Sequence, residues 1–413
     1  MQGALTTPAG RVRSLRVART AGLAGLAIAI LLLPVWAQVS TEVGVYWAIG
    51  LAFGFILQRS RFCFAGAFRD LWLARDGRLM RAVILGLLVA TTGFTLLMAR
   101  FVPDPSFGDL PPKAHIMPVG LHLVVGGLAF GTGMVLAGGC VSGTLFRIGE
   151  GYVASWVTLG GILLGLAGAA HTWNWWWTVH ISRQPAIWLP RALGFGWSAA
   201  VVLAALGALY VAIMWWESRD GMPFFATWSQ TEPPPTTFTE RLAAIWRTVF
   251  VHGWPAAAGG VALGVLNIMS YAYNHPLGVT GELSAWSDRL FSAVGLGAGH
   301  LLGTDQFAGC NLVSDGGGLI TSSLTLDAGL IAGSLVAALL AGEFKLRFPQ
   351  AKIRYLQSLG GGVLMGYGAG LALGCTIGAF FSAIPSLALS GWVFGASLCA
   401  GAFLGVQAIK RLP

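Results

Sequence analysis

The sequence is poor in charge. Asp, Glu, Lys and Arg make up 10% of its 413 residues, whereas hydrophobic residues make up 55%. A soluble protein of this length needs about 25% charged residues to cover its surface. This shortage excludes a soluble globular protein and indicates that most of the outer surface contacts membrane lipid. The formal net charge of +9 therefore reflects basic residues that orient the chain in a membrane. We expect no nucleic-acid partner.

Cysteine is scarce as well, with five residues, several of which lie in apolar sequence. This pattern does not fit the disulfide framework of a small secreted protein, so we expect free thiols. The sequence also has no CxxC pair, no Walker glycine loop and no HExxH motif. We therefore predict a protein that is not an enzyme, does not hydrolyse ATP itself, and needs neither a cofactor nor a metal.

Long apolar runs are abundant in the chain. About 20 helical residues cross a hydrocarbon core of about 30 Å, and ten runs approach that length. A shorter run at 291–303 predicts a half-helix. We expect an all-α polytopic membrane protein with about 9–11 membrane helices, some of them short, re-entrant or broken. The predicted spans are 21–39, 43–58, 81–99, 119–138, 152–171, 193–216, 248–272, 328–342, 355–374 and 388–408.

The basic residues predict the orientation of these spans. If the N-terminus is cytoplasmic and the chain crosses ten times, most of the 25 lysines and arginines fall on the cytoplasmic side. Both termini are then cytoplasmic. The chain divides into a basic cytoplasmic tail (1–20), a first membrane repeat (21–216), a Pro-rich cytoplasmic linker (217–247) and a second membrane repeat (248–413).

The two halves carry a weak internal duplication. Nine of eighteen residues match between 126–143 and 361–378, and the matches include a Gly-Cys pair in each segment. In the predicted topology the first segment runs inward and the second runs outward. This arrangement predicts two inverted repeats, with a transport site near the bilayer midplane between broken helices. Further upstream, the alignment places Cys63 opposite Cys310.

The matching Gly-Cys pairs are Gly139-Cys140 and Gly374-Cys375. A new helix that begins after each cysteine offers unpaired N–H groups and the positive end of a helix dipole, which together attract an anion. A thiol adds a weak donor and a polarisable sulfur without the cost of a buried lysine. The alternative is that each cysteine is a small hydrophobe and each glycine a packing contact. Because the pair recurs in both repeats, we predict that these four residues bind an anion.

A third stretch, "QRSRFCFAGAFRD" at 58–70, places Arg59, Arg61 and Arg69 around Cys63 near a membrane boundary. The arginines either anchor the helix to the cytoplasmic side or concentrate anions at the mouth of a pore.

Three segments, in this order, resemble signatures of the YeeE/YedE-like sulfur-transport family, which includes thiosulfate importers. They are "GFILQRSRFCFAGAFRDL", "GTGMVLAGGCVSGT" and "GYGAGLALGCTIGAF". The likeness covers residues 45–408 and implies a bacterial inner-membrane protein. It also implies an hourglass of inverted halves, in which short broken helices meet at the centre.

The resemblance further implies a relay of thiols that hands thiosulfate inward through S–H hydrogen bonds. By motif these thiols are Cys63, Cys140 and Cys375, whereas Cys310 enters the relay only through the repeat alignment. The implied partners are a small sulfur-containing anion and a cytosolic sulfur-carrier or rhodanese-like protein.

Two alternatives stay open at this point. One is a membrane sulfurtransferase or redox enzyme in which Cys63 or Cys140 is a nucleophile. The other is a transporter for a selenium compound, because some relatives are linked to selenium metabolism. A persulfide on Cys63 after exposure to thiosulfate would favour the enzyme, and uptake without a covalent adduct would favour the transporter.

Overall fold

The structure is a computed structural model that describes residues 8–107, 109–218, 246–304 and 320–411. Helices joined by turns and loops account for this part of the chain, which contains no named strand. Cys310 and most of the predicted linker lie outside the described residues.

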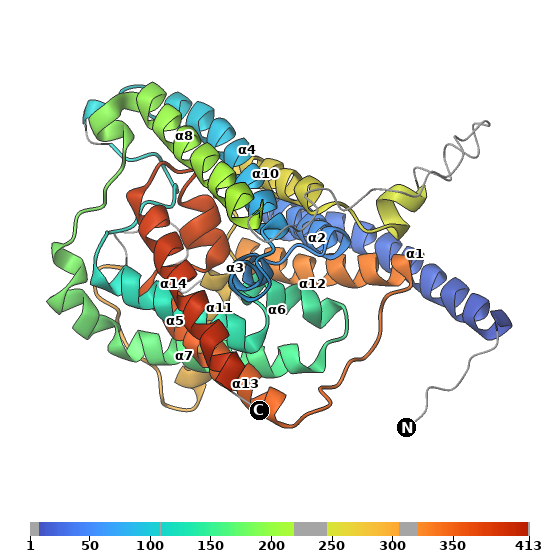
Figure 1. The fold of residues 1–413 in the computed structure, drawn as a ribbon. Helices are drawn as coiled ribbons and strands as arrows, with labels where there is room; N and C mark the ends of the chain where they lie inside the picture. Colours follow the sequence, from blue (N-terminus) through green and yellow to red (C-terminus); the bar gives the residue numbers. More distant parts are fainter. Residues whose placement is uncertain (1–7, 108, 219–245, 305–319, 412–413) are drawn as a thin grey trace.

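Thirteen α-helices and the short π-helix η5 make up most of the described part of the fold, and three further short helical turns lie in its loops (Figure 1). They are α1 (Pro8–Val39), α2 (Thr41–Ser60), α3 (Phe64–Leu73), α4 (Arg78–Phe101), α5 (Leu121–Ala137), α6 (Val141–Gly149), α7 (Val153–Val179), α8 (Pro190–Ser218), α10 (Ala256–Tyr273), α11 (Thr280–Ala293), α12 (Ser322–Ala341), α13 (Ile353–Leu371), η5 (Thr376–Ser382) and α14 (Leu389–Arg411).

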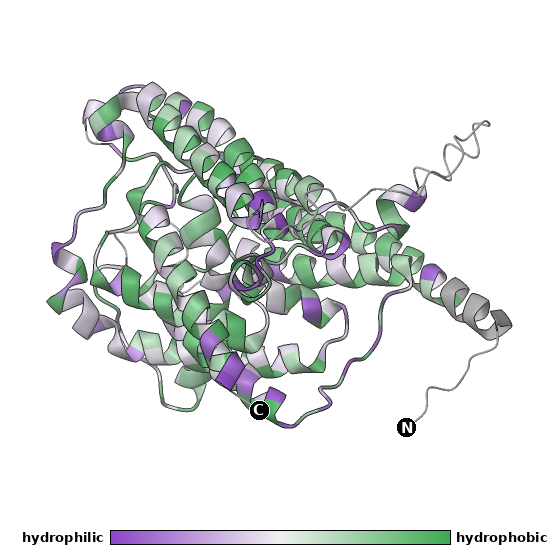
Figure 2. Ribbon diagram, in the orientation of Figure 1, coloured by the Kyte–Doolittle hydropathy of each residue, from purple (hydrophilic) through white to green (hydrophobic). Residues whose placement is uncertain are grey.

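Nine spans in the described ranges are long and apolar enough to cross a membrane. A tenth results if α13 and η5, which meet at a bend of 48°, count as one span. Apolar residues cover the long helices, and hydrophilic residues gather near the C-terminal end of α14 (Figure 2). The prediction of an all-α polytopic membrane protein is confirmed.

The helices form two groups that meet around the short ones. In one group α2 packs on α12, and α10 packs on both α4 and α2. In the other, α5 packs on α13 and α14, and α13 packs on α7. Figure 1 shows α4, α8 and α10 running together, with α3 seen end-on near the centre. Because α3 contacts α4, α5 and α14, and α6 contacts α2, α7 and α12, the short helices lie between the groups.

Glycines allow the closest of these contacts, as expected for membrane helices. A Cβ added at Gly54 of α2 would collide with the carbonyl oxygen of Leu330 of α12. A Cβ added at Gly366 of α13 would collide in the same way with the carbonyl oxygen of Ile162 of α7. The backbones of these two helix pairs are therefore in direct contact.

The order of long and short helices occurs twice along the chain. The series α2, α3, α4, α5, α6, α7 is followed by α10, α11, α12, α13, η5, α14. The contacts cross between the two series, because α5 packs on α14 whereas α13 packs on α7. This order agrees with an internal duplication, and the inverted orientation of the two series in a membrane stays a prediction.

Several local predictions are wrong, among them the start of the span at 248–272, because α10 begins only at Ala256. The half-helix expected at 291–303 is absent, because the short helix α11 ends at Ala293 and the chain continues without helix through Gly295, Gly297 and Gly299. Glycine costs about 1 kcal/mol per residue in a helix, so three of them end it. The predicted span 152–171 is also too short, since α7 runs on to Val179.

Candidate functional site

Each of three cysteines immediately precedes a short helix. Cys63 precedes α3, Cys140 precedes α6 and Cys375 precedes η5, and each cysteine has an extended backbone. Two residues before each cysteine, the backbone enters the left-handed region. These residues are Arg61 (φ 48°), Gly138 (φ 77°) and Leu373 (φ 52°). The same backbone path thus interrupts three different spans.

The helix starts predicted after Cys140 and Cys375 are confirmed. The break at Cys63 was missed, because "SRFC" contains no glycine to signal it and Arg61 takes the left-handed conformation instead. A non-glycine residue with this conformation is uncommon, and such residues cluster at functional sites.

The beginning of each short helix presents N–H groups that have no partner within the helix. At α6, the Cys140 sulfur accepts a hydrogen bond from the Gly143 N–H at 3.4 Å and lies 3.4 Å from the Ser142 hydroxyl. Cys63 and Cys375 make no such side-chain cap in the described structure. The three helix starts therefore combine a thiol with a positive dipole end, the arrangement that favours an anion.

The three thiols are buried, and contacts between neighbouring residues link them in space. Cys63, Cys140 and Cys375 are 8%, 1% and 0% exposed. A Cβ added at Gly143 would lie 3.3 Å from the Cys140 sulfur and 3.7 Å from the Cys63 sulfur, so both thiols border the same small space. Cys140 also lies close to the hydroxyl of Thr376, the residue that follows Cys375. That buried hydroxyl has no hydrogen bond of good geometry in the described structure.

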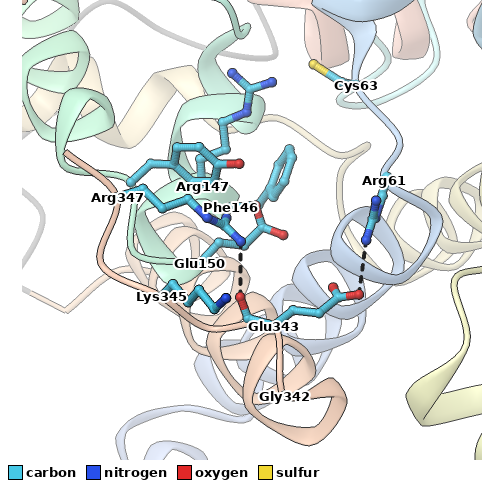
Figure 3. Close-up of a pocket in the computed structure, with 10 residues that line it drawn as sticks. Arg61, Cys63, Phe146, Arg147, Glu150, Gly342, Glu343, Lys345 and Arg347 are labelled. Atoms are coloured by element: carbon cyan, nitrogen blue, oxygen red, sulfur yellow. Dashed lines mark hydrogen bonds and ion pairs between the residues drawn. The ribbon is translucent and has the colours of Figure 1, made fainter. Parts of the chain in front are cut away.

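Cys63 also lines a pocket of about 430 Å³ (Figure 3). Four basic and two acidic side chains surround it, so the pocket has a net positive charge. They are Arg61, Arg147, Lys345, Arg347, Glu150 and Glu343.

Ion pairs with two arginines fix the position of Glu343 at this pocket. Glu343 accepts from Arg61 at 3.0 Å and from the buried Arg59 at 2.9 Å. Partial burial alone would raise the pKa of Glu343, but the charges of these arginines prevail and lower it. Burial raises the pKa of Glu150. A negative charge is therefore held on Glu343 and disfavoured on Glu150. Of the remaining basic groups, Arg147 donates to the backbone carbonyl of Gly138 and Arg347 to that of Glu343.

A histidine that sequence reasoning missed lies beside the break at Cys375. His115 is buried in the loop before α5, and its backbone N–H donates to the Ser386 hydroxyl at 3.2 Å. Burial lowers the pKa of His115 to about 4, so the ring is neutral near pH 7. Its Nε2 has no hydrogen-bond partner among the described residues. No local pattern distinguishes this histidine in the sequence, because it is selected only by its contact with Gly374.

The fourth described cysteine, Cys399 on α14, is separate from this arrangement. It lines an apolar groove with side chains such as Leu206, Phe380 and Trp392. Cys399 thus behaves as a core residue. Cys310 lies outside the described residues, and its predicted place in the path is not tested. No group of three potential metal ligands occurs in the described ranges.

The two glycines of the Gly-Cys pairs have different surroundings, so valine should affect them unequally. A Cβ at Gly374 would lie 2.9 Å from the Ala379 nitrogen and 3.1 Å from His115 Cε1, and neither can move away easily. At Gly139 the nearest atom is the flexible end of Arg147, at 3.2 Å. We expect Gly374→Val to abolish anion uptake and Gly139→Val to reduce it only in part, as measured with radiolabelled anion at matched membrane expression. Equal uptake by the two variants would contradict this assignment.

Comparison with known proteins gives results that agree with one another, because each match is to a transport family or a transporter. The family model described as sulphur transport matches residues 59–404, a range that includes all three break cysteines. The thiosulfate transporter TsuA of Spirochaeta thermophila is 32% identical over 84% of this chain and 92% of that protein. The thiosulfate transporter TsuA of Escherichia coli is 29% identical over 83% of this chain and 88% of that protein. The probable transporter YedE of Escherichia coli is 31% identical over 43% of this chain and 42% of that protein.

Proposed function

Because this chain belongs to the sulphur transport family, we propose that it imports thiosulfate, or a related small sulfur-containing anion, across the bacterial inner membrane. Its likeness to two thiosulfate transporters over most of their length supports this substrate class. The observation that carries the proposal is the repeated placement of a buried thiol at the start of a short helix, three times in one region.

The contacts give an order to the proposed path. The anion passes from the His115 side to Cys375, then to Cys140, then to Cys63, and leaves through the basic pocket. Gly374 lies next to His115, Thr376 faces Cys140, and Cys140 shares a space with Cys63. Each step is therefore supported by a contact between neighbours along the path.

Neutral thiols suit transport because they bind an anion weakly enough to release it. The S–H group is a weak donor, and its sulfur is polarisable. The N–H groups of the helix starts add partial positive charge without a buried cation. A relay of this kind passes the anion on by exchange of hydrogen bonds, and no covalent bond forms.

The pocket at Cys63 is the proposed cytoplasmic exit. Arg61, Arg147, Lys345 and Arg347 all lie on the side that the positive-inside rule assigns to the cytoplasm. The two termini lie on that side in the same topology. A cytosolic sulfur-carrier or rhodanese-like protein would then receive the anion at this pocket.

Uptake by a bacterial host tests the proposal. A strain that cannot obtain sulfur from thiosulfate should grow on it when this chain is expressed, and its membrane vesicles should accumulate radiolabelled thiosulfate. Sulfate, sulfite and selenite, offered in turn, define the selectivity. Mass spectrometry of the protein after uptake should find Cys63 and Cys140 unmodified. Growth on selenite alone, or a stable persulfide without uptake, would contradict the proposal.

A further inference from the structure

A second buried polar site lies away from the cysteines, on α12. Asp327 is 6% exposed within this membrane span, and neither of its carboxylate oxygens has a hydrogen-bond partner in the described structure. Buried polar groups are almost always paired, so this carboxyl group requires an explanation. An ionisable side chain inside a membrane span is a candidate for a functional role.

Glu282 of α11 is the acidic neighbour of Asp327. It is 4% exposed, and its Oε2 accepts a hydrogen bond from the Thr321 hydroxyl at 2.5 Å, while its Oε1 has no partner. The buried hydroxyl of Thr280, in the same turn of α11, also lacks a partner in the described ranges. Unpaired acceptors and a hydroxyl thus gather where α11 meets α12.

Neither carboxylate oxygen of Asp327 has a cationic partner among the described residues. The nearby carboxylate of Glu282 adds negative charge to the surroundings of Asp327. The other elements packed against α12 are α1, α2, α6 and η3 (Arg247–Val251), and none of their described side chains makes a hydrogen bond with Asp327. Two buried carboxylates cannot both be ionised without a cation, because each loses its hydration and repels the other. Asp327 accepts no hydrogen bond among the described residues, so it is the member on which we expect a proton.

The position of α12 connects this pair to the thiols. α12 packs along α2, which ends just before the break at Cys63, and it also contacts α6, which begins just after Cys140. A change of charge at Asp327 therefore acts on a helix that touches both sides of the proposed path. Under the proposed function, a membrane potential that is negative inside opposes the import of an anion, so cations that accompany it would assist transport.

We propose that Asp327 and Glu282 form a proton-binding site that couples import of the sulfur anion to the inward movement of protons. This inference rests on the proposed function. A proton suits the site better than a metal ion, because the described residues contain no group of three acidic, histidine or cysteine side chains that could hold one.

Transport by the full chain in liposomes tests the coupling. The buffer contains no sodium, potassium with valinomycin holds the membrane potential at zero, and the interior is more alkaline than the exterior. We expect this pH gradient to stimulate accumulation of radiolabelled thiosulfate by wild type about tenfold, within the usual range of coupling between two sites. A trapped pH dye should report acidification that depends on thiosulfate.

Asp327→Asn is nearly isosteric with the protonated carboxyl group and should fold normally. We expect it to lose the stimulation by the pH gradient and the acidification, while exchange of labelled for unlabelled thiosulfate continues. Asp104→Asn is the matched control, because Asp104 lies in the loop after α4 and bonds only to Ser106 among the described residues. This control should behave as wild type. A pH-gradient response that survives in Asp327→Asn, or stimulation of wild type by sodium instead of protons, overturns the proposal.

A measurement without substrate separates this inference from the proposed function. The infrared C=O stretch of a protonated carboxyl group should be present at pH 7 in wild type and lost in Asp327→Asn. If that band is lost as expected but wild type transports no thiosulfate, the substrate assignment fails and the proton site stands. If the band is identical in both proteins, the proton site is refuted.

Discussion

Replacing Cys140 with alanine is expected to lower the rate of thiosulfate uptake by about tenfold or more, and replacing Cys375 should do the same. Loss of one hydrogen bond at a buried site costs about 1–3 kcal/mol, which corresponds to this change in rate. Both thiols are almost completely buried at a helix start, so no water molecule from the bulk replaces the sulfur easily. Uptake into membrane vesicles, normalised to the amount of protein, is the measurement.

Cys399→Ala is the matched control for these variants. Cys399 is also a free thiol in a membrane helix, but it lines the apolar groove and not the path. It should transport at the rate of wild type. Uptake above half of the wild-type rate in both Cys140→Ala and Cys375→Ala would refute the relay. A large loss in Cys399→Ala would show that the effect of cysteine removal is general.

Filling the space between two thiols should be equally damaging. Gly143→Val adds a side chain whose Cβ would lie 3.3 Å from the Cys140 sulfur and 3.7 Å from the Cys63 sulfur. Valine would therefore separate the two thiols and occupy the position that the anion needs between them. We expect uptake to fall about tenfold or more, by the same loss of buried hydrogen bonds.

Gly160→Val controls for the introduction of a β-branched residue into a glycine-rich membrane helix. A Cβ at Gly160 of α7 meets no atom within 4 Å, so the side chain extends into open space. Thermal stability of both purified variants shows whether either change disturbs the fold. If Gly143→Val folds and transports as well as Gly160→Val does, the anion does not pass between Cys140 and Cys63.

The sequence was sufficient to predict the breaks at Cys140 and Cys375, because glycines flank a cysteine at matching places in both halves. It was insufficient at Cys63, where the left-handed residue is Arg61 and only tertiary packing selects that conformation. His115 could not be predicted for a similar reason, since its role depends on a contact with a glycine far away in the chain. Glycine-rich residues 291–303 were too apolar to be recognised as a loop by hydropathy alone.

The order of helices also bears on Cys310. In the second series α11 takes the place of α3, and the residue that precedes α11 is Val279. By element order, Val279 is therefore the counterpart of Cys63, whereas the sequence alignment gave that place to Cys310. Insertion of a glycine-rich segment after α11 shifts such an alignment, and sequence identity alone does not reveal the shift. Cys310 as a relay thiol stays a prediction.

The backbone contacts at Gly54 and Gly366 limit how this protein can move. Because α2 touches α12 and α7 touches α13 without intervening side chains, neither helix of a pair can rotate against its partner without a collision at these glycines. Each pair is therefore a stiff unit. The short elements are α3, α6 and η5, which have 10, 9 and 7 residues. We therefore expect conformational change during a transport cycle to involve local rearrangements of these three short elements at the centre, and not reorientation of whole halves.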